Sequence, residues 1–245
     1  MSEKLKPFEG LEPEILLDNK PTSDLLNGLL KVPSEFNPIF VIGCPRSGTT
    51  LLGNILGGNE NIACADESMF LLDLWNMYSK VSLAGNRRES IFLSSYTSPQ
   101  KHLEYLAEYV QNVYTDLLES KPGARTVVDH TPVYSHLFNF IELIFGGSFY
   151  VHITRNEADV IKSLAKVREK GGAWGQPDNE TRRQFRNHWI KDAREIKKTA
   201  PDRYFELSYE DLVENPELAL TDFLTSNDYS WSKSMTDKSN TLYAQ

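Results

Sequence analysis

The fold is decided by the stretch Ile39-Phe40-Val41-Ile42-Gly43-Cys44-Pro45-Arg46-Ser47-Gly48-Thr49-Thr50. Its first four residues are apolar and mostly β-branched, and they lie between a proline and a glycine. This pattern favours a strand buried on both faces of a parallel sheet. The glycine-containing turn that follows leads into a predicted helix over residues 49–56. Gly57 and Gly58 come next, and we expect a glycine in the left-handed conformation to close this helix.

The rest of the chain alternates strand and helix patterns. Strands are predicted over residues 126–128, 148–154 and 204–207, and helical spacing occurs over 67–80, 100–119, 134–145, 158–168 and 180–199, before a short helical end. The alternation predicts a P-loop-like α/β fold of three layers, α/β/α, with a central, mostly parallel sheet. Residues 38–245 would form this domain. Residues 1–37 are expected to be an irregular lead with one helical piece near 22–30.

Composition and charge exclude several classes of protein. The 245 residues carry a formal net charge of −8, which disfavours a nucleic-acid partner and requires any anion site to be local. Cys44 and Cys64 stand without a CxxC pair or a companion histidine cluster, so we expect buried thiols rather than a disulfide or a structural zinc site. No apolar run approaches the roughly 20 residues that cross a bilayer. We therefore predict no membrane span and a cytoplasmic location.

The loop between the first strand and its helix indicates phosphate binding. Backbone N–H groups and the helix dipole make this position an anion site. Gly43 and Gly48 have the spacing of a Walker A loop, but Thr49 stands where a nucleotide triphosphatase carries lysine. The cation is instead Arg46, inside the loop. A simple tight turn would leave this arginine and the neighbouring hydroxyl groups unexplained, so the loop predicts a phosphate-bearing ligand and disfavours hydrolysis of ATP or GTP.

The form Pro45-Arg46-Ser47-Gly48-Thr49-Thr50-Leu51-Leu52 resembles the 5′-phosphosulfate loop of the sulfotransferase superfamily. It is most similar to the branch that includes tyrosylprotein, bacterial and polyketide-associated sulfotransferases. Two further motifs follow in the family's order: Arg155 at a strand end with Ser163 eight residues later, and Tyr209-Glu210-Asp211-Leu212-Val213. The resemblance covers roughly residues 38–224. It implies an enzyme that takes a sulfuryl group from 3′-phosphoadenosine 5′-phosphosulfate and releases adenosine 3′,5′-bisphosphate.

The resemblance also implies which residues bind the donor. The 3′-phosphate would contact Arg155 and Ser163, and the adenine would contact Tyr209. The 5′-phosphosulfate would be held by Arg46 together with the backbone and hydroxyl groups of Ser47, Gly48, Thr49 and Thr50. A guanidinium at this place stabilises the charge that develops on the leaving oxygen. One departure is Leu51, which stands where cytosolic sulfotransferases of small phenols place a tryptophan against the adenine.

A general base is expected beside the acceptor, because the acceptor hydroxyl must lose its proton as it attacks sulfur. Glu67 follows the first helix at the place where the tyrosylprotein branch carries its catalytic glutamate. His130 follows a predicted strand at the sheet edge where α/β proteins gather ligands. It could act as a base when neutral or as a hydrogen-bond donor when protonated. Glu67 could instead start a helix, and His130 could bond to a backbone carbonyl. No metal is required for the in-line transfer.

Two other functions fit parts of the pattern. A P-loop kinase or nucleotide hydrolase would need Mg²⁺ and an acidic partner, for which Asp129 is the candidate. A non-catalytic nucleotide-binding module would bind the bisphosphate without using Glu67 or His130. The acceptor class stays open among small molecules, lipids, carbohydrates and carrier-bound groups that offer a hydroxyl or amine. We expect residues 82–99 and the glycine-rich loop 169–179 to shape its pocket.

Overall fold

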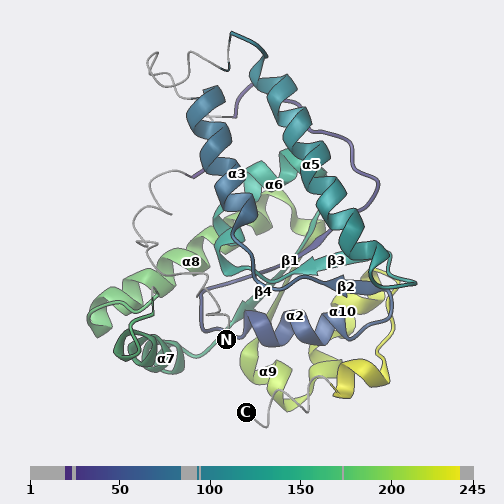
Figure 1. Cartoon of the computed structure of the whole chain (residues 1–245). Helices are drawn as coiled ribbons and strands as arrows, with labels where there is room; N and C mark the ends of the chain where they lie inside the picture. The colour runs from purple at the N-terminus through teal and green to yellow at the C-terminus, as the bar shows by residue number, and fades with distance from the viewer. Residues whose placement is uncertain (1–19, 24–25, 84–92, 94, 173, 238–245) are drawn as a thin grey trace, which may run out of the picture.

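A parallel sheet of five strands forms the centre of the computed structural model, which describes residues 20–23, 26–83, 93, 95–172 and 174–237 (Figure 1). The strands are β1 Ile39–Ile42, β2 Ile62–Cys64, β3 Thr126–Asp129, β4 Phe149–Thr154 and β5 Tyr204–Ser208, in the order β2-β3-β1-β4-β5. All four strand pairs are parallel. The central position of β1, between β3 and β4, places the loop that follows it at the switch point where α/β folds bind ligands.

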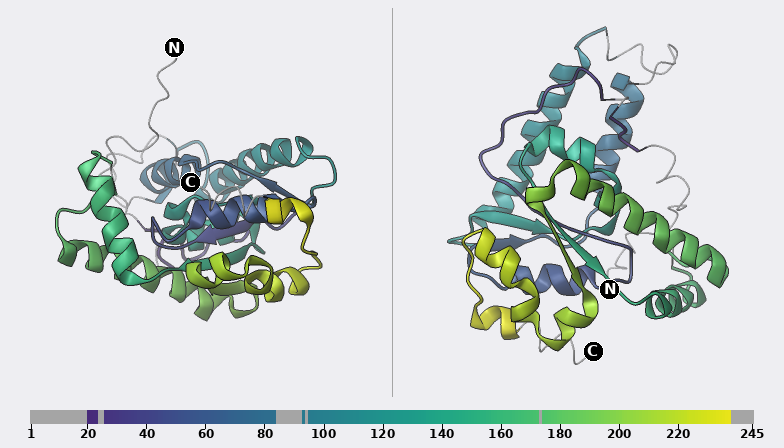
Figure 2. Two further views of the ribbon diagram at one scale, coloured as in Figure 1. Left: turned by 90° about the horizontal axis from the view of Figure 1, so that it is seen from below. Right: turned by 180° about the vertical axis from the view of Figure 1, so that it is seen from behind.

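Helices cover both faces of this sheet. They are α2 Thr49–Gly57, α3 Phe70–Tyr78, α5 Pro99–Glu119, α6 Phe138–Phe145, α7 Glu157–Glu169, α8 Asn179–Thr199, α9 Tyr209–Glu214 and α10 Pro216–Ser226, with a π-helix η1 Ser79–Leu83 and the 3₁₀ helices η2 Pro132–His136 and η3 Pro201–Arg203. In Figure 1, α3, α5 and α6 lie above the sheet, and α2, α9 and α10 lie below it. Figure 2 shows the same layers from two other sides, with α7 beside α8.

Burial of both faces of β1 explains why its residues are apolar without interruption. Phe40 and Ile42 belong to one core cluster, with α3, α5, α6 and α8, whereas Ile39 and Val41 belong to a second, with α2 and α10. The alternation is that of a strand, whose successive side chains point to opposite faces. The lead segment joins the first cluster through Leu26, which is 6 % exposed. The predicted α/β/α fold with a mostly parallel sheet is therefore confirmed.

Several local predictions were wrong. The described residues of 22–30 form turns rather than a helix, and the three-residue strand β2 was missed. The predicted helix over 134–145 is two elements, η2 and α6. Gly58 closes α2 in the right-handed conformation, with φ −69°. Glycine at position 58 allows close packing instead, because a Cβ on this residue would lie 2.9 Å from the Cα of Met235. Residues 84–92 and 94, within the predicted loop 82–99, lie outside the described residues.

A lysine joins the C-terminal end of α2 to the segment after α5. The Lys121 Nζ donates to the carbonyl oxygens of Gly57, Asn59 and Ile62 at 2.8, 2.6 and 2.8 Å. A cation near the last carbonyls of a helix also interacts favourably with the helix dipole. The contact fixes the far end of the helix that begins at the phosphate loop.

Replacing this ammonium tests its contribution to stability. The Lys121→Met variant keeps the aliphatic stem but loses all three donated bonds, so we expect its free energy of unfolding to fall by about 3 kcal/mol. Urea denaturation monitored by circular dichroism measures the change. Lys101→Met is the control, because Lys101 is solvent-exposed and, among the described residues, pairs with nearby side chains such as Glu104. Equal stability losses in the two variants would contradict the interpretation.

Candidate donor and catalytic site

The loop between β1 and α2 has the backbone shape of an anion site. Arg46 adopts the left-handed conformation, with φ 75°, and Gly48 has φ 104°. Gly48 is the N-cap of α2 and has no side chain to accept a bond from the first turn. The first N–H groups of a helix lack intrahelical acceptors, so those of this turn are available to a ligand. A Cβ on Gly48 would lie 2.5 Å from the Tyr209 ring, which makes glycine necessary there.

Two arginines that the sequence placed in separate motifs meet beside this loop. The Arg46 Nε lies 3.1 Å from the Ser163 Oγ and donates to it, and the Arg155 Nη1 donates to the Arg46 carbonyl at 3.3 Å. The Arg155 guanidinium carbon lies 4.1 Å from the centre of the Tyr209 ring. A purely structural role for Arg155 would be an ion pair with Asp159. No such ion pair is present among the described residues. The structure therefore brings the predicted groups for both phosphates together.

A cavity of about 400 Å³ opens in front of the loop, within the size range of small-ligand sites. Its lining includes seven predicted site residues: Arg46, Gly48, Thr49, Thr50, Glu67, Arg155 and Tyr209. The other lining residues are Pro45, Leu51, Pro132 and Trp174. The residue Ser47 is 2 % exposed and is not part of this lining. Trp174 was missed as an individual residue, and its place in a glycine-rich loop was the signal that could have found it. It lines the same cavity as Leu51.

Glu67 and His130, the two candidate bases, are neighbours. The Thr50 hydroxyl donates to the Glu67 Oε1 at 2.7 Å, and the His130 Nδ1 lies 3.7 Å from the same oxygen. The Glu67 side chain is 26 % exposed and faces the cavity, whereas that of His130 is 3 % exposed and does not line it. His130 comes this close to α2 because residue 53 is glycine: a Cβ at Gly53 would lie 2.3 Å from its ring.

The surroundings set opposite charge states for this pair. Burial would raise the pKa of Glu67, but contacts with His130 and Thr50 and the charge of Arg46 hold it below its usual value. Burial would likewise lower the pKa of His130, yet its contacts with Cys64 and Glu67 outweigh burial and raise it. An anionic carboxylate beside an imidazolium is therefore the favoured state at neutral pH.

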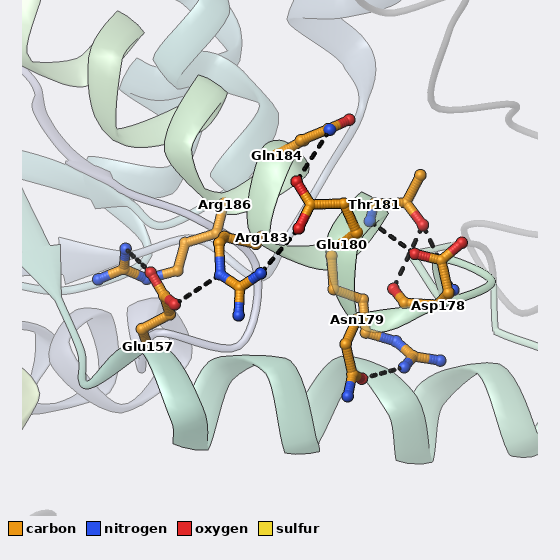
Figure 3. Close-up of polar contacts among 9 residues, drawn as sticks. Glu157, Asp178, Asn179, Glu180, Thr181, Arg183, Gln184 and Arg186 are labelled. Atoms are coloured by element: carbon orange, nitrogen blue, oxygen red, sulfur yellow. Dashed lines mark hydrogen bonds and ion pairs between the residues drawn. The ribbon is translucent and has the colours of Figure 1, made fainter.

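A network between α7 and α8 supports the strand end that carries Arg155. The Arg186 Nη2 donates to the Arg155 carbonyl at 3.0 Å. Glu157 lies 3.6 Å from the Arg186 Nη1 (Figure 3). The Arg183 Nε donates to the Glu157 Oε1 at 2.9 Å, and the Arg183 Nη1 donates to the Glu180 Oε2 at 2.8 Å. Sequence reasoning missed Arg186, because no motif of the chain contains it.

Asp129 cannot easily serve as the magnesium ligand that a kinase would need. It is 1 % exposed, and its carboxylate accepts bonds from the Tyr114 hydroxyl at 2.9 Å and the Thr131 N–H at 3.0 Å. Burial raises its pKa. Both oxygens thus already have partners within the protein.

A parallel α/β sheet with an anion-binding loop after its central strand defines a P-loop-like phosphate-binding domain. The comparisons with known proteins narrow this class. The chain belongs to the sulfotransferase family, because the model of that family, described as "Sulfotransferase family", matches residues 38–233. The predicted superfamily is therefore confirmed.

In the described residues, every helix is too short or too polar to cross a bilayer.

Two proteins that this chain resembles in sequence are less than 30 % identical to it. An uncharacterized protein of Aquifex aeolicus is 29 % identical over 209 residues, which are 81 % of this chain and 26 % of that protein. A putative protein-tyrosine sulfotransferase of Caenorhabditis briggsae is 24 % identical, over 80 % of this chain and 67 % of that protein. The chain thus spans about a quarter of the length of the Aquifex protein.

Solved structures share the fold. The sulfotransferase domain from the curacin biosynthetic pathway has a TM-score of 0.58 at 19 % identity, covering 82 % of this chain and 77 % of that chain. The sulfotransferase domain of the Synechococcus PCC 7002 olefin synthase has a TM-score of 0.56 at 20 % identity, covering 86 % and 78 %. At these identities the likeness concerns the fold.

A Cβ added to the loop glycine should weaken nucleotide binding. In Gly48→Ala, the methyl group meets the Tyr209 ring, so we expect affinity for adenosine 3′,5′-bisphosphate to fall at least about tenfold, since 1.4 kcal/mol of steric cost suffices. Calorimetric titration measures the affinity. Gly123→Ala is the matched control: Gly123 also has a positive φ, 91°, but its nearest Cβ contact would be 3.9 Å away, outside the cavity. Equal binding losses in both variants would point to general strain instead.

Proposed function

We propose that this chain transfers a sulfuryl group in line from 3′-phosphoadenosine 5′-phosphosulfate to an acceptor hydroxyl or amine. The observation that carries the proposal is the meeting of an open helix N-terminus, two arginines and an anionic glutamate around one cavity. Family membership supports the reaction. The motifs for the 5′- and 3′-phosphates support the donor.

Donor binding in this proposal uses the loop for the phosphosulfate and the β4 end for the 3′-phosphate. Arg46 and the N–H groups of Gly48, Thr49 and Thr50 face the sulfuryl end. Arg155 and Ser163 take the 3′-phosphate, and Tyr209 supports the adenine. As the bond from sulfur to the bridging oxygen breaks, negative charge grows on that oxygen, and donors already in place stabilise it without reorganisation.

Glu67 is the proposed general base. It faces the cavity, and its lowered pKa favours the ionised form that accepts a proton from the acceptor. His130 is a positioning residue in this proposal, because it lies behind Glu67 rather than in the lining. The apolar groups of Leu51, Pro132 and Trp174 in the same lining favour an acceptor with an apolar part beside its nucleophile.

Nucleotide selectivity tests the donor site. We expect adenosine 3′,5′-bisphosphate to bind at least about tenfold more tightly than ADP, because a charge-assisted bond to the extra phosphate contributes about 1.5–3 kcal/mol. Arg155→Ala should remove this preference, and Arg46→Ala should weaken both ligands. Calorimetric titration compares them, with Arg125→Ala as the control, because Arg125 is exposed and does not line the cavity. Equal or better binding of ADP would remove the donor assignment and restore the kinase alternative.

The pH dependence of transfer tests the base. Glu67 must be ionised, so the rate should rise with pH through its lowered pKa and then level off. Glu67→Gln should abolish transfer of radiolabelled sulfuryl groups to an acceptor panel while bisphosphate binding persists. Asp66→Asn, which changes the exposed carboxylate next to it, should keep both.

The role of His130 shows in the same profile. Without the imidazolium, the pKa of Glu67 should return toward its usual value, so His130→Gln should move the acid limb of the rate profile to higher pH. Bisphosphate affinity should not change. An acid limb that stays in place in a folded His130→Gln protein would rule out this positioning role.

A further inference from the structure

Two histidines and an aspartate meet behind the donor site, where η2 packs on α8. The Nδ1 of His136 lies 2.6 Å from the Oδ2 of Asp192, and the Nε2 of His188 lies 3.5 Å from the same oxygen. The three potential ligand atoms all lie within 4.8 Å of one another. The Lys20 ammonium lies among them, 2.6 Å from the His188 Nε2 and in ion-pair contact with Asp192. The cluster already holds a cation, supplied by the chain itself.

The geometry is close to that of a transition-metal site. Ligand atoms bound to one Zn²⁺ at 2.0–2.2 Å in tetrahedral arrangement are about 3.3–3.6 Å apart, and the His188–Asp192 separation falls in this range. These two residues are four positions apart on one face of α8, a spacing that lets both reach one ion. The His136–Asp192 contact must lengthen slightly. An imidazole pair with one carboxylate favours Zn²⁺ over Mg²⁺ or Ca²⁺.

One proton must move when a metal binds. The His136 Nδ1 and the Asp192 Oδ2 are hydrogen-bonded at 2.6 Å, which places a proton between them. The Nε2 of His136 is buried and has no hydrogen-bond partner among the described residues. A neutral His136 can therefore carry its proton on Nε2 and offer the Nδ1 lone pair to the ion.

We propose that His136, His188 and Asp192 form a binding site for Zn²⁺ or a similar divalent transition-metal ion, in which the metal replaces the Lys20 ammonium. A cavity of about 390 Å³ reaches Lys20, His136 and Asp192 and offers the entry path. The site is separate from the donor cavity. It connects to it through η2, whose Pro132 lines that cavity and whose Ser135 Oγ accepts a bond from the Gly43 N–H at 3.1 Å.

Cobalt and zinc titrations of tag-free protein test the site without any activity assay. Co²⁺ should give a saturable d–d absorption band, and Zn²⁺ should displace it at a ratio of one ion per chain. His188→Ala should weaken the affinity by more than about tenfold, the loss expected even for an outer-shell partner. Glu195→Gln, one turn from Asp192 and in the same cavity lining, should bind like the wild type.

Competition with Lys20 separates a metal site from a simple ion-pair cluster. Lys20→Met removes the resident cation, so we expect Zn²⁺ affinity to rise by about fivefold or more. Thermal melts confirm that each variant is folded, and His188 was chosen over the buried His136 for that reason. Absence of saturable Co²⁺ binding in both wild type and Lys20→Met would overturn the proposal. So would affinity that is unchanged in His188→Ala or in Lys20→Met.

Discussion

The open N-terminus of α2 is the constraint on which the site depends. Its first backbone N–H groups have no intrahelical acceptors, and the residue at the N-cap is a glycine that cannot supply one. In five of the other described helices a side-chain oxygen caps the first turn, from Ser98, Asn156, Asp178, Ser208 or Asn215, whereas α3 and α6 resemble α2 in having no side-chain cap. Helix α2 has no side-chain cap and begins at the switch point of a parallel sheet. Its free N–H groups are therefore available to bind an external anion.

Arg46 and Arg155 likewise keep a charge that a ligand can neutralise. Among the described residues, Arg183, Arg194 and Arg203 form ion pairs with glutamates. Arg46 and Arg155 instead contact a hydroxyl, a carbonyl and an aromatic ring, none of which neutralises a guanidinium. In a chain of net charge −8, these contacts orient the two cations and leave their charge for a ligand. The attraction is local, as the overall charge requires.

Local sequence signals predicted most of the fold but only part of the site. The strand β1, its loop and α2 are contiguous in the sequence. Their residue pattern was therefore enough to predict this strand, loop and helix. Arg186 and Trp174 reach the site only through packing of α8 and the loop before it, a relation that periodicity does not encode. The Arg46–Ser163 contact spans 117 positions and was not predicted, because the family resemblance placed Ser163 with Arg155 at one phosphate and Arg46 at the other. The strand β2 has three residues, too few for an alternating pattern to be recognised.

Helix α2 connects the donor-binding loop to the proposed base. Thr50 belongs to the anion loop through its backbone and to the base through its hydroxyl, which bonds to Glu67 at 2.7 Å. One turn further on, Gly53 admits the His130 ring against the same helix. Lys121 holds the other end of α2. Glu67 itself lies in the loop between β2 and α3, so its bond to this short, doubly anchored helix helps to fix its distance from the donor, and other loops can shape the acceptor side. That division explains why the donor motifs are readable in the sequence and the acceptor is not.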